Sequence, residues 1–196
     1  MKIAILYICT GKYNVFWKGF FESSEKKFLQ KSQKEYFVFT DDEHLFGADQ
    51  SNVHIIPHKY MGWPYDTLMR FEVFSSIEKE LVGFYYIFFF NANMVINEVI
   101  NEEEFLKVKA HDVNLIMVQH PGVYNKKTRY LPYCRDPKST AFIPYNKGNK
   151  YVMGALNGGK AKYFIELINT LKNNTQIDLD NNVIALVHDE SHLNKY

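Results

Sequence analysis

Residues 84–96 read FYYIFFFNANMVI, and we take this stretch as the one that decides the fold. Its first seven residues are aromatic or β-branched, and the run lies between Gly83 and Asn91. Such a run is too short to span a membrane and is typical of a central strand buried on both faces. Ligands bind beyond the carboxyl ends of strands in open α/β sheets, so Asn91-Ala92-Asn93 is a candidate binding turn. An Asn-rich turn without a binding role is the alternative.

The rest of the chain predicts an α/β protein with a Rossmann-like, mostly parallel central sheet and helices on both faces. The opening order of strand, helix and strand is typical of this class. Besides the central strand, apolar segments predict strands at 3–8, 36–40, 53–56, 115–118, 141–144, 151–153 and 183–187. Helical spacing of apolar residues predicts helices at 15–31, 65–81 and 160–171, the last introduced by Gly158-Gly159.

Length, charge and cysteine content narrow the function classes. A chain of 196 residues is expected to form a single domain, 1–196, with a sizeable core. Its formal net charge of +1 makes no case for a nucleic-acid partner. Two cysteines, Cys9 and Cys134, are too few for a disulfide framework and fit a reducing compartment. No run reaches the roughly 18 apolar residues of a transmembrane helix.

A cluster of ionisable residues follows the apolar segment 183–187. If that segment is a strand, His188, Asp189, Glu190 and His192 lie at its end, and one carboxylate could bind while the other acts as base or nucleophile. A helix amino terminus, where acidic residues are favoured, is the alternative. A metal-dependent hydrolase is a weaker alternative, because the two histidines lack the glutamate placement of the zinc protease motif.

Other residues have both a functional and a structural interpretation. His120 could donate to a ligand hydroxyl or satisfy its own loop. Arg70 could bind a phosphate or carry a solvated charge. Trp63 could stack on a sugar or pack in a turn, and residues 153–155 could be ordinary strand packing.

Several segments together resemble one enzyme family. The most specific are YVMGALNGG at 151–159 and HDESHLNKY at 188–196. FVFTDD at 37–42, GWP at 62–64, Arg70, QHPGVY at 119–124 and AFIP at 141–144 occur in the same order. The chain resembles, over nearly its whole length, the family 6 glycosyltransferases, retaining enzymes that include the blood-group A and B transferases and bacterial relatives.

The resemblance implies a GT-A fold and an enzyme that transfers galactose or N-acetylgalactosamine from its UDP derivative. The acceptor would be the 3-hydroxyl of a β-galactoside, with or without fucose, and the new linkage would be α. Glu190 matches the catalytic glutamate, acting through a covalent intermediate or by stabilising an ion pair in a front-face reaction. A catalytically weak UDP-sugar or glycan-binding module is the alternative.

The resemblance also implies residue roles. Donor-binding positions are Ile8, Cys9, Thr10, Tyr13, Arg70, Asn91, Ala92, Asn93, Met153, Gly154, Ala155 and Asp189. Acceptor-binding positions are His120, Trp63 and His188. Met153 and Ala155 match the blood-group B pair, and their bulk leaves less room for a 2-acetamido group, which favours UDP-galactose.

The chain departs from the family pattern at three places. Asn91-Ala92-Asn93 stands where vertebrate members have the Asp-X-Asp that holds Mn²⁺, as in bacterial members. Neutral amides bind a divalent cation far more weakly than carboxylates, so no metal cofactor is expected. Val187 replaces a tryptophan and residues 132–136 replace Thr-Tyr-Glu-Arg-Arg, which leaves the acceptor aglycone open.

The family continues past HDESHLNKY whereas this chain stops at Tyr196, so weakened donor binding is expected. These features fit a bacterial cytoplasmic enzyme of cell-surface glycan synthesis, with peripheral association with the inner membrane as a variant.

Overall fold

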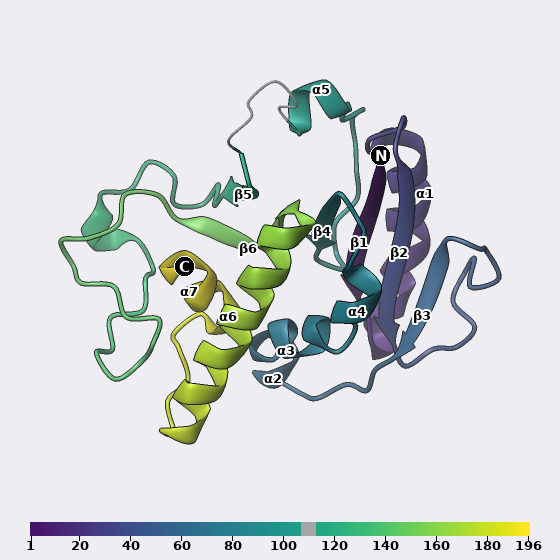
Figure 1. The fold of residues 1–196 in the computed structure, drawn as a ribbon. Coiled ribbons are helices and arrows are strands. Elements are labelled where there is room, and N and C mark those ends of the chain that lie inside the picture. The colour runs from purple at the N-terminus through teal and green to yellow at the C-terminus, as the bar shows by residue number, and fades with distance from the viewer. Residues whose placement is uncertain (107–112) are drawn as a thin grey trace. The chain divides into compact units, whose positions relative to one another are not determined.

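A computed structural model describes residues 1–106 and 113–196 (Figure 1). Its elements in chain order are β1 (Lys2–Ile8), η1 (Gly11–Phe16), α1 (Trp17–Lys27), β2 (Gln33–Thr40), β3 (Val53–Pro57), α2 (Tyr65–Leu68), α3 (Arg70–Ser75), α4 (Glu78–Leu81), β4 (Tyr86–Phe90), α5 (Glu102–Phe105), β5 (Leu115–Gln119), η2 (Thr128–Tyr130), β6 (Val152–Lys160), α6 (Ala161–Asp180) and α7 (His188–Lys195). Strands and helices mix as expected for the α/β class.

The chain forms two compact units, each built from separate segments. Unit 1 comprises Met1–Tyr60, Leu81–Ile116 and Ala155–Tyr163. Unit 2 comprises Met61–Glu80, Met117–Gly154 and Phe164–Tyr196. The prediction of a single domain over 1–196 stays a prediction, and the two units are described separately below.

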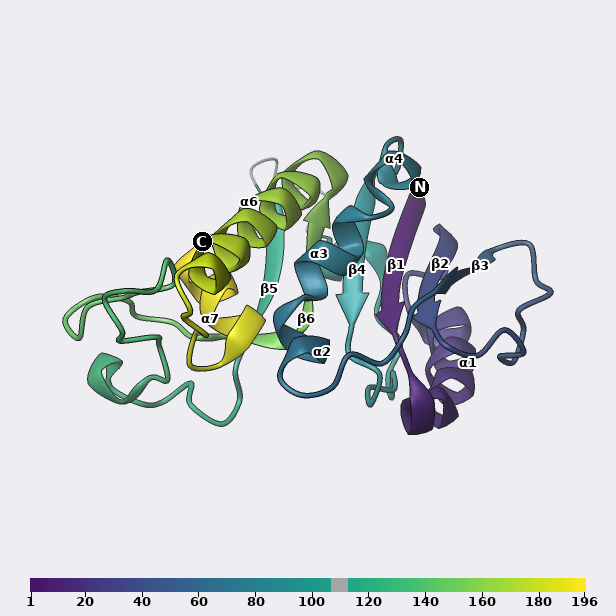
Figure 2. The ribbon, with the colours of Figure 1, turned by 90° about the horizontal axis from the view of Figure 1, so that it is seen from below.

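The strands form a mostly parallel sheet of order β3-β2-β1-β4-β6-β5. In unit 1, β1 pairs in parallel with β2 on one side and β4 on the other, and β2 pairs in parallel with β3. Figure 2 shows β1 between β2 and β4. Strand order reverses at β1, which has β2 on one side and β4 on the other. Because β1 and β4 are parallel, the loops that follow them lie at the carboxyl ends of the strands, where open α/β sheets bind ligands.

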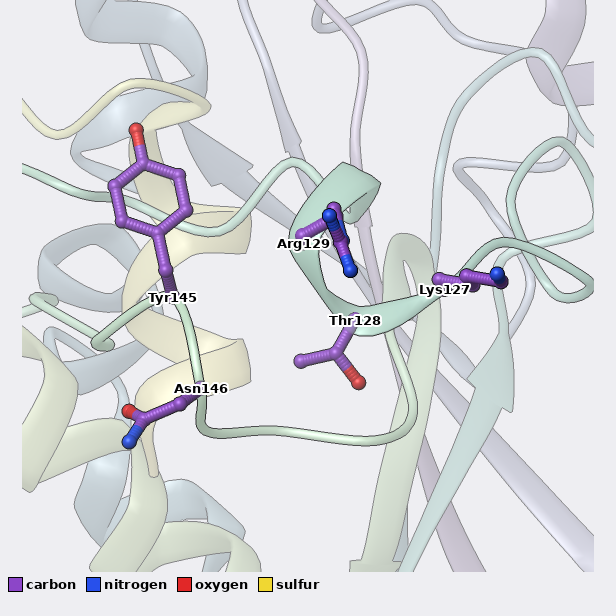
Figure 3. A pocket seen from close by; sticks show the side chains of 5 residues that line it. All are labelled: Lys127, Thr128, Arg129, Tyr145 and Asn146. Atoms are coloured by element: carbon purple, nitrogen blue, oxygen red, sulfur yellow. The ribbon is translucent and has the colours of Figure 1, made fainter.

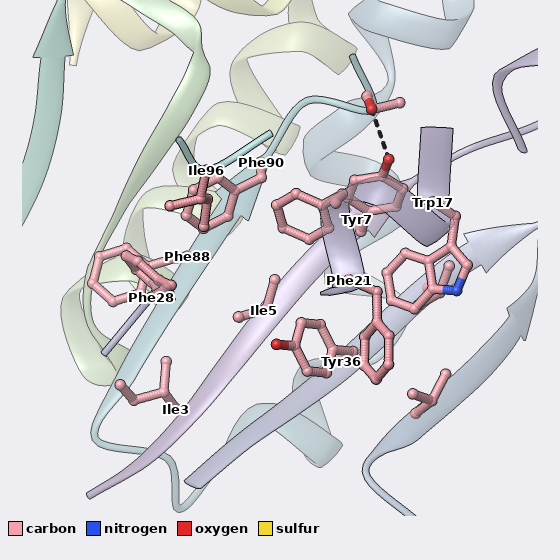
Figure 4. Close-up of a cluster of buried hydrophobic side chains, with 14 of the residues drawn as sticks. Ile3, Ile5, Tyr7, Trp17, Phe21, Phe28, Tyr36, Phe88, Phe90 and Ile96 are labelled. Atoms are coloured by element: carbon pink, nitrogen blue, oxygen red, sulfur yellow. Dashed lines mark hydrogen bonds between the residues drawn. The ribbon is translucent and has the colours of Figure 1, made fainter. Parts of the chain in front are cut away.

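Aromatic packing forms the core of unit 1 (Figure 4). The Tyr7 and Phe20 rings stack with centroids 4.6 Å apart, and the centroids of the Trp17 and Phe21 rings are 5.2 Å apart. Phe88 and Phe90 of β4 project into the same cluster. Aromatic side chains of α1, β1 and β4 therefore pack the helix against the sheet.

The predicted central strand is confirmed as β4, and its last four residues are all buried. Phe88 and Phe90 belong to the aromatic core, whereas the intervening Phe89 alternates to the other face and is 1% exposed. The strand begins at Tyr86, and the preceding Tyr85 is 64% exposed. Burial on both faces explains why the sequence there lacks alternation.

A helix follows Gly158-Gly159 as predicted, since α6 begins at Ala161, and both glycines belong to the end of β6. β6 pairs antiparallel with β4, with Gly158 opposite Phe88. A Cβ on Gly158 would lie 2.3 Å from the carbonyl oxygen of Ile87, so only glycine permits this approach. The helix that follows, α6, extends to Asp180 rather than residue 171.

The predicted helix 15–31 is shorter than expected. Phe16 ends a 3-10 turn and is 44% exposed, and α1 stops at Lys27. Phe28 adopts an extended conformation, and its ring packs 5.1 Å from Phe90. Leu29 then takes a positive φ of 45°. Tertiary packing of Phe28 therefore ends the helix before its helical periodicity does.

Three further predictions need correction. The helix expected at 65–81 is divided into α2, α3 and α4, with Met69 (φ −88°, ψ 9°) between the first two. Residues 141–144 form no strand. Residues 183–187 form none either, although Val183 and Ala185 are buried while Ile184 and Leu186 are exposed. The burial alternates as in a strand, but no strand among the described residues pairs with this segment.

Within residues 1–106 and 113–196, no helix combines the length and the apolar character needed to cross a membrane. Cys9 and Cys134 are both buried free thiols.

Candidate active site

In unit 1, the loop after β1 is held by the loop after β2. Cys9 donates its N–H to the Phe39 carbonyl at 2.9 Å, and the Gly11 N–H lies 2.9 Å from both Asp41 carboxylate oxygens. The Asn14 amide also donates to Asp41 at 3.0 Å. These donors hold the pKa of Asp41 below its ordinary value. The ionised carboxylate thus links the loop after β1 to the loop after β2.

The first predicted donor residues lie along this loop. Ile8 ends β1, Cys9 is fully buried and Thr10 is 8% exposed. Burial raises the pKa of the Cys9 thiol to about 12, so it stays a neutral packing group. Tyr13, at 47% exposure, is the member of the set with a ring open to a ligand.

The Asn91-Ala92-Asn93 turn follows β4 as predicted. The Tyr7 hydroxyl donates to the Ala92 carbonyl at 2.7 Å, and the Asn91 N–H donates to the Ala155 carbonyl at 2.8 Å (Figure 4 shows the first). The Asn91 amide donates to the Asn93 side chain at 3.0 Å. The backbone of this turn is therefore fixed from β1 and from β6.

A cavity of about 410 Å³ in unit 1 joins these two loops. It is lined by Lys12, Tyr13, Val15, Phe16 and Asn93. Val15 is 75% exposed, and the Tyr13 and Phe16 rings lie 5.9 Å apart. Exposed aromatic faces beside an amide and an ammonium group suit a heterocyclic base attached to phosphates.

The donor set on this turn does not fit a divalent cation. Asn91 and Asn93 supply neutral amides that already bond each other, and Mg²⁺ or Mn²⁺ at such a position prefers carboxylate oxygens. Among the residues that the structure describes, no three His, Cys, Asp or Glu side chains are arranged to hold a metal ion. The metal-hydrolase alternative gains no support from this geometry.

In unit 2, α7 carries the predicted acidic pair on its first turn. His188, Asp189 and Glu190 begin the helix, so the expectation that they follow a strand is wrong and the helix-terminus alternative is correct. Arg70 of α3 donates from one Nη to the Asp189 carboxylate at 2.5 Å and to the Gly154 carbonyl at 2.9 Å. Arg70 is 7% exposed and Asp189 4%, so the alternative of a solvated charge at Arg70 is wrong, and the two side chains form a buried ion pair.

Burial raises the pKa of Asp189 to about 6, against the lowering effect of the Arg70 guanidinium. The neighbouring charge of Glu190 raises this pKa further. At neutral pH Asp189 is therefore ionised, but it is poised to take up a proton in mildly acidic solution.

Glu190 is held by two donors. The Tyr151 hydroxyl donates to one of its carboxylate oxygens at 2.7 Å, and the Gly154 N–H donates to the other at 2.5 Å. Tyr151 is 1% exposed, and its pKa is raised by burial and by Glu190, so the phenol remains a donor. Both oxygens of Glu190 are thus oriented by groups on one short segment of the chain.

Gly154 lies where Arg70, Asp189 and Glu190 converge. A Cβ at this position would be 3.3 Å from the Arg70 guanidinium and 3.3 Å from the Glu190 carboxylate, with Asp189 at 3.4 Å. Glycine leaves these side chains in hydrogen-bonding range of its backbone. Met153 precedes it and is partly exposed.

The predicted acceptor residues lie beside this carboxylate cluster, all within unit 2. The His188 ring bonds the Thr67 hydroxyl at 2.9 Å and meets the Trp63 ring edge-on at 5.3 Å. Trp63 is 78% exposed. Desolvation lowers the pKa of His188, which favours its neutral form. His120 donates its backbone N–H to the Tyr151 carbonyl at 2.8 Å.

The structure thus gathers the predicted residues into two sets. Unit 1 holds Ile8, Cys9, Thr10, Tyr13, Asn91, Ala92, Asn93 and Ala155, and unit 2 holds Arg70, Met153, Gly154, Asp189, Glu190, His120, Trp63 and His188. Sequence reasoning assigned no role to Tyr151, Asn194, Lys12 or Asp41. All but Lys12 lie in motifs quoted above, but their contacts depend on residues distant in the chain.

Comparison with known proteins gives one family. The family model described as Glycosyltransferase family 6 matches residues 1–196. The chain is 40% identical over 196 residues to the O-antigen biosynthesis glycosyltransferase WbnI of Escherichia coli, covering all of this chain and 82% of that protein.

Vertebrate relatives are more distant. The chain is 29% identical over 204 residues to Histo-blood group ABO system transferase 2 of Rattus norvegicus and 27% identical over 205 residues to Globoside alpha-1,3-N-acetylgalactosaminyltransferase 1 of Gallus gallus. The two matches include 99% and 100% of this chain, but only 58% and 57% of the relatives. The chain therefore spans little more than half the length of these vertebrate proteins.

Proposed function

The chain belongs to glycosyltransferase family 6, and we propose that it transfers a hexose from a UDP-sugar to the 3-hydroxyl of a β-galactoside, retaining the α configuration. The α/β architecture described above is the GT-A fold of this family. The observation that carries the proposal is the Glu190 carboxylate, fixed by Tyr151 and Gly154 beside the buried Arg70–Asp189 pair.

Glu190 is the proposed catalytic residue. Its two hydrogen bonds leave a negative charge of defined orientation, which would stabilise positive charge developing at the anomeric carbon as UDP departs. A covalent glycosyl intermediate on Glu190 and a front-face ion pair both use this charge. In the second route the departing phosphate takes the acceptor proton.

The remaining residues are proposed to bind the two substrates. Tyr13 and Phe16 would contact the nucleotide, and Asp189 would accept hydrogen bonds from donor-sugar hydroxyls. Trp63 and His188 would present an aromatic surface to the acceptor galactose, with His120 beside Tyr151.

Galactose is the proposed donor sugar. Met153 and Ala155 flank Gly154, whose surroundings are already filled by Arg70, Asp189 and Glu190. An acetamido group needs more space than a hydroxyl, and these side chains supply bulk where smaller residues would leave room.

Transfer is proposed to be independent of metal. Two carboxylates at positions 91 and 93 would repel a diphosphate unless a cation intervened, whereas the amides present there do not. Lys12, which lines the same cavity as Asn93, would offset leaving-group charge.

The E. coli relative is named for O-antigen biosynthesis. We accordingly propose a bacterial cell-surface glycan as the class of product. The alternative function is a UDP-sugar or glycan-binding module without turnover, for which the neutral Asn pair is the motivating observation.

The first test is UDP release from UDP-galactose and UDP-N-acetylgalactosamine, with lactose or 2'-fucosyllactose as acceptor. Glu190→Gln keeps the shape of the side chain and is expected to lower turnover at least about a hundredfold while leaving UDP-galactose binding nearly unchanged. Glu166→Gln, at an exposed position of α6 in unit 2, is the matched control. Binding without UDP release would favour the module, and near-normal turnover of Glu190→Gln would contradict the role of Glu190.

A further inference from the structure

Basic residues are concentrated in one segment of unit 2. Between positions 124 and 150 there are seven lysines and arginines, and Asp136 is the one acidic residue, so this segment carries a formal charge of +6. The whole chain carries +1. Such an asymmetry creates a local positive field that attracts anions, although the protein as a whole is nearly neutral.

A cavity of about 600 Å³ lies within this segment. Its lining residues are Lys127, Thr128, Arg129, Tyr145 and Asn146. Figure 3 shows Thr128 and Arg129 on the η2 turn, and Tyr145 and Asn146 on a separate loop facing them. These five lining residues, all within the described part of the chain, supply two cations and no carboxylate.

Arg135 braces the two walls of this cavity. Its guanidinium donates to the Ile143 and Pro144 carbonyls at 2.7 and 2.6 Å, and to the Thr128 carbonyl at 3.1 Å. The same group lies 4.7 Å from the centroid of the Tyr145 ring. The cavity is therefore organised before any ligand binds, and a third positive charge lies behind it.

None of these three cations is neutralised by a neighbour. Among residues 1–106 and 113–196, no ion pair includes Lys127, Arg129 or Arg135. Positive charges that line or brace one cavity repel one another, and an anion bound in the cavity relieves this repulsion. Lys127 and Arg129 have exposed side chains, so they can reach such an anion.

Packed aromatic rings connect this cavity with Glu190. The Arg135 guanidinium lies 5.1 Å from the centre of the Tyr133 ring, and the Tyr133 and Tyr151 rings are 5.4 Å apart. Tyr151 in turn donates to Glu190. All of these residues belong to unit 2, and Tyr133 and Tyr151 are buried, so the packed rings fix the position of the cavity relative to Glu190.

We propose that this cavity binds a phosphate or diphosphate group on the reducing end of the acceptor, and so selects a glycosyl phosphate over a neutral glycan. The inference rests on the proposed function, since it assigns the cavity to the acceptor of that reaction. Arginine and lysine together suit phosphate oxygens, and the Tyr145 ring suits the adjoining sugar face.

The test compares lactose 1-phosphate with lactose, both by acceptor kinetics and by calorimetric titration. Lys127→Ala/Arg129→Ala is expected to raise the Kd and KM for lactose 1-phosphate by about tenfold or more while leaving the KM for lactose and for the donor within about twofold. Lys126→Ala/Lys138→Ala removes equal charge from the same segment outside the cavity and is expected to leave both acceptors unaffected. Titration does not require turnover, so selective loss of lactose 1-phosphate binding supports the site even if no transfer occurs.

Four outcomes would overturn the proposal. An equal loss in both double variants would mean diffuse electrostatics, and an equal loss for lactose and lactose 1-phosphate would mean a structural effect. Inorganic pyrophosphate that competes with UDP, and binds the cavity variant as tightly as the unaltered protein, would assign the anion to the donor. Sedimentation with phosphatidylglycerol and phosphatidylcholine vesicles is the separate arm for lipid headgroups. Lys127/Arg129-dependent vesicle binding without any effect on lactose 1-phosphate would replace the acceptor with a membrane surface.

Discussion

Asp189 combines two properties at the scale of a single residue. It is buried in an ion pair with Arg70, yet its pKa is raised to about 6. A buried pair of this kind contributes little net stability, since desolvation offsets much of the attraction. Its value is a carboxylate held rigidly where the proposed donor-sugar hydroxyls would need an acceptor.

UDP-galactose binding is accordingly expected to weaken as the pH falls through about 6, because protonated Asp189 loses its charge. Calorimetric titration of UDP-galactose can use Glu190→Gln, which is expected to turn over little substrate. The pH midpoint of the binding change should lie somewhat lower in this variant than in the unaltered protein, since the Glu190 charge is one cause of the raised pKa of Asp189. The folded-state pKa exceeds the ordinary value of 3.8, so protonation between pH 6 and 4 stabilises the folded form at this group. Protonation of Asp189 does not by itself destabilise the fold in this pH range.

UDP is the control ligand for this titration, because it lacks the sugar that Asp189 is proposed to contact. A pH step of the same size for UDP would assign the titration to the nucleotide and contradict the role of Asp189.

At the scale of elements, the Asn194 side chain joins α7 to β6, in addition to the bond from the Gly154 N–H to Glu190. The Asn194 amide oxygen accepts from the Val152 N–H at 2.9 Å, and its nitrogen donates to the Val152 and Glu190 carbonyls, each at 2.8 Å. It therefore pairs with Val152 as a neighbouring strand would. Because Gly154 lies two residues beyond Val152, this contact sets the position of Glu190 relative to its donors.

Asn194→Ala is expected to lower stability by about 1–3 kcal/mol, because both polar groups of Val152 lose a partner. It is also expected to lower kcat by about tenfold or more with little change in donor KM, as Glu190 loses its defined orientation. Thermal unfolding and kinetics well below the melting temperature separate the two effects. Lys195→Ala, an exposed neighbour on α7, is the control. A kcat that falls only by the unfolded fraction would leave Asn194 a purely structural residue.

At the scale of the whole molecule, the predicted functional residues divide between two units. Unit 1 holds an aromatic cavity and neutral amides beyond β1 and β4, and unit 2 holds the buried ion pair and the oriented glutamate. Charge is also uneven, with the basic segment 124–150 inside a chain of net charge +1. Cationic side chains are therefore available in both units to offset the charge of phosphates.

Turnover is accordingly expected to be unchanged by EDTA. Asn91→Asp/Asn93→Asp should lower the rate without metal, through repulsion between carboxylates and the diphosphate, and Mn²⁺ should restore part of it. The measurement is UDP release with EDTA, with Mn²⁺ and with neither. Loss of activity of the unaltered protein in EDTA would refute metal-independent transfer.

The sequence by itself determined the fold class and the family. The uninterrupted apolar run of β4, the strand-helix-strand opening and the motifs at 151–159 and 188–196 are local patterns, and local patterns record burial and chemistry directly. It also placed the Asn91–Asn93 turn at the end of a buried strand, as observed.

Only the tertiary structure decided which partners these residues meet. Residues 183–187 alternate in burial like a strand, but no described strand pairs with them, and Phe28 leaves the helical pattern to pack on Phe90. The two donors on Glu190 and the loops that enclose the basic cavity come from distant positions. The spacing of apolar residues predicts which side chains are buried, whereas hydrogen-bond partners depend on segments that meet only when the chain has folded.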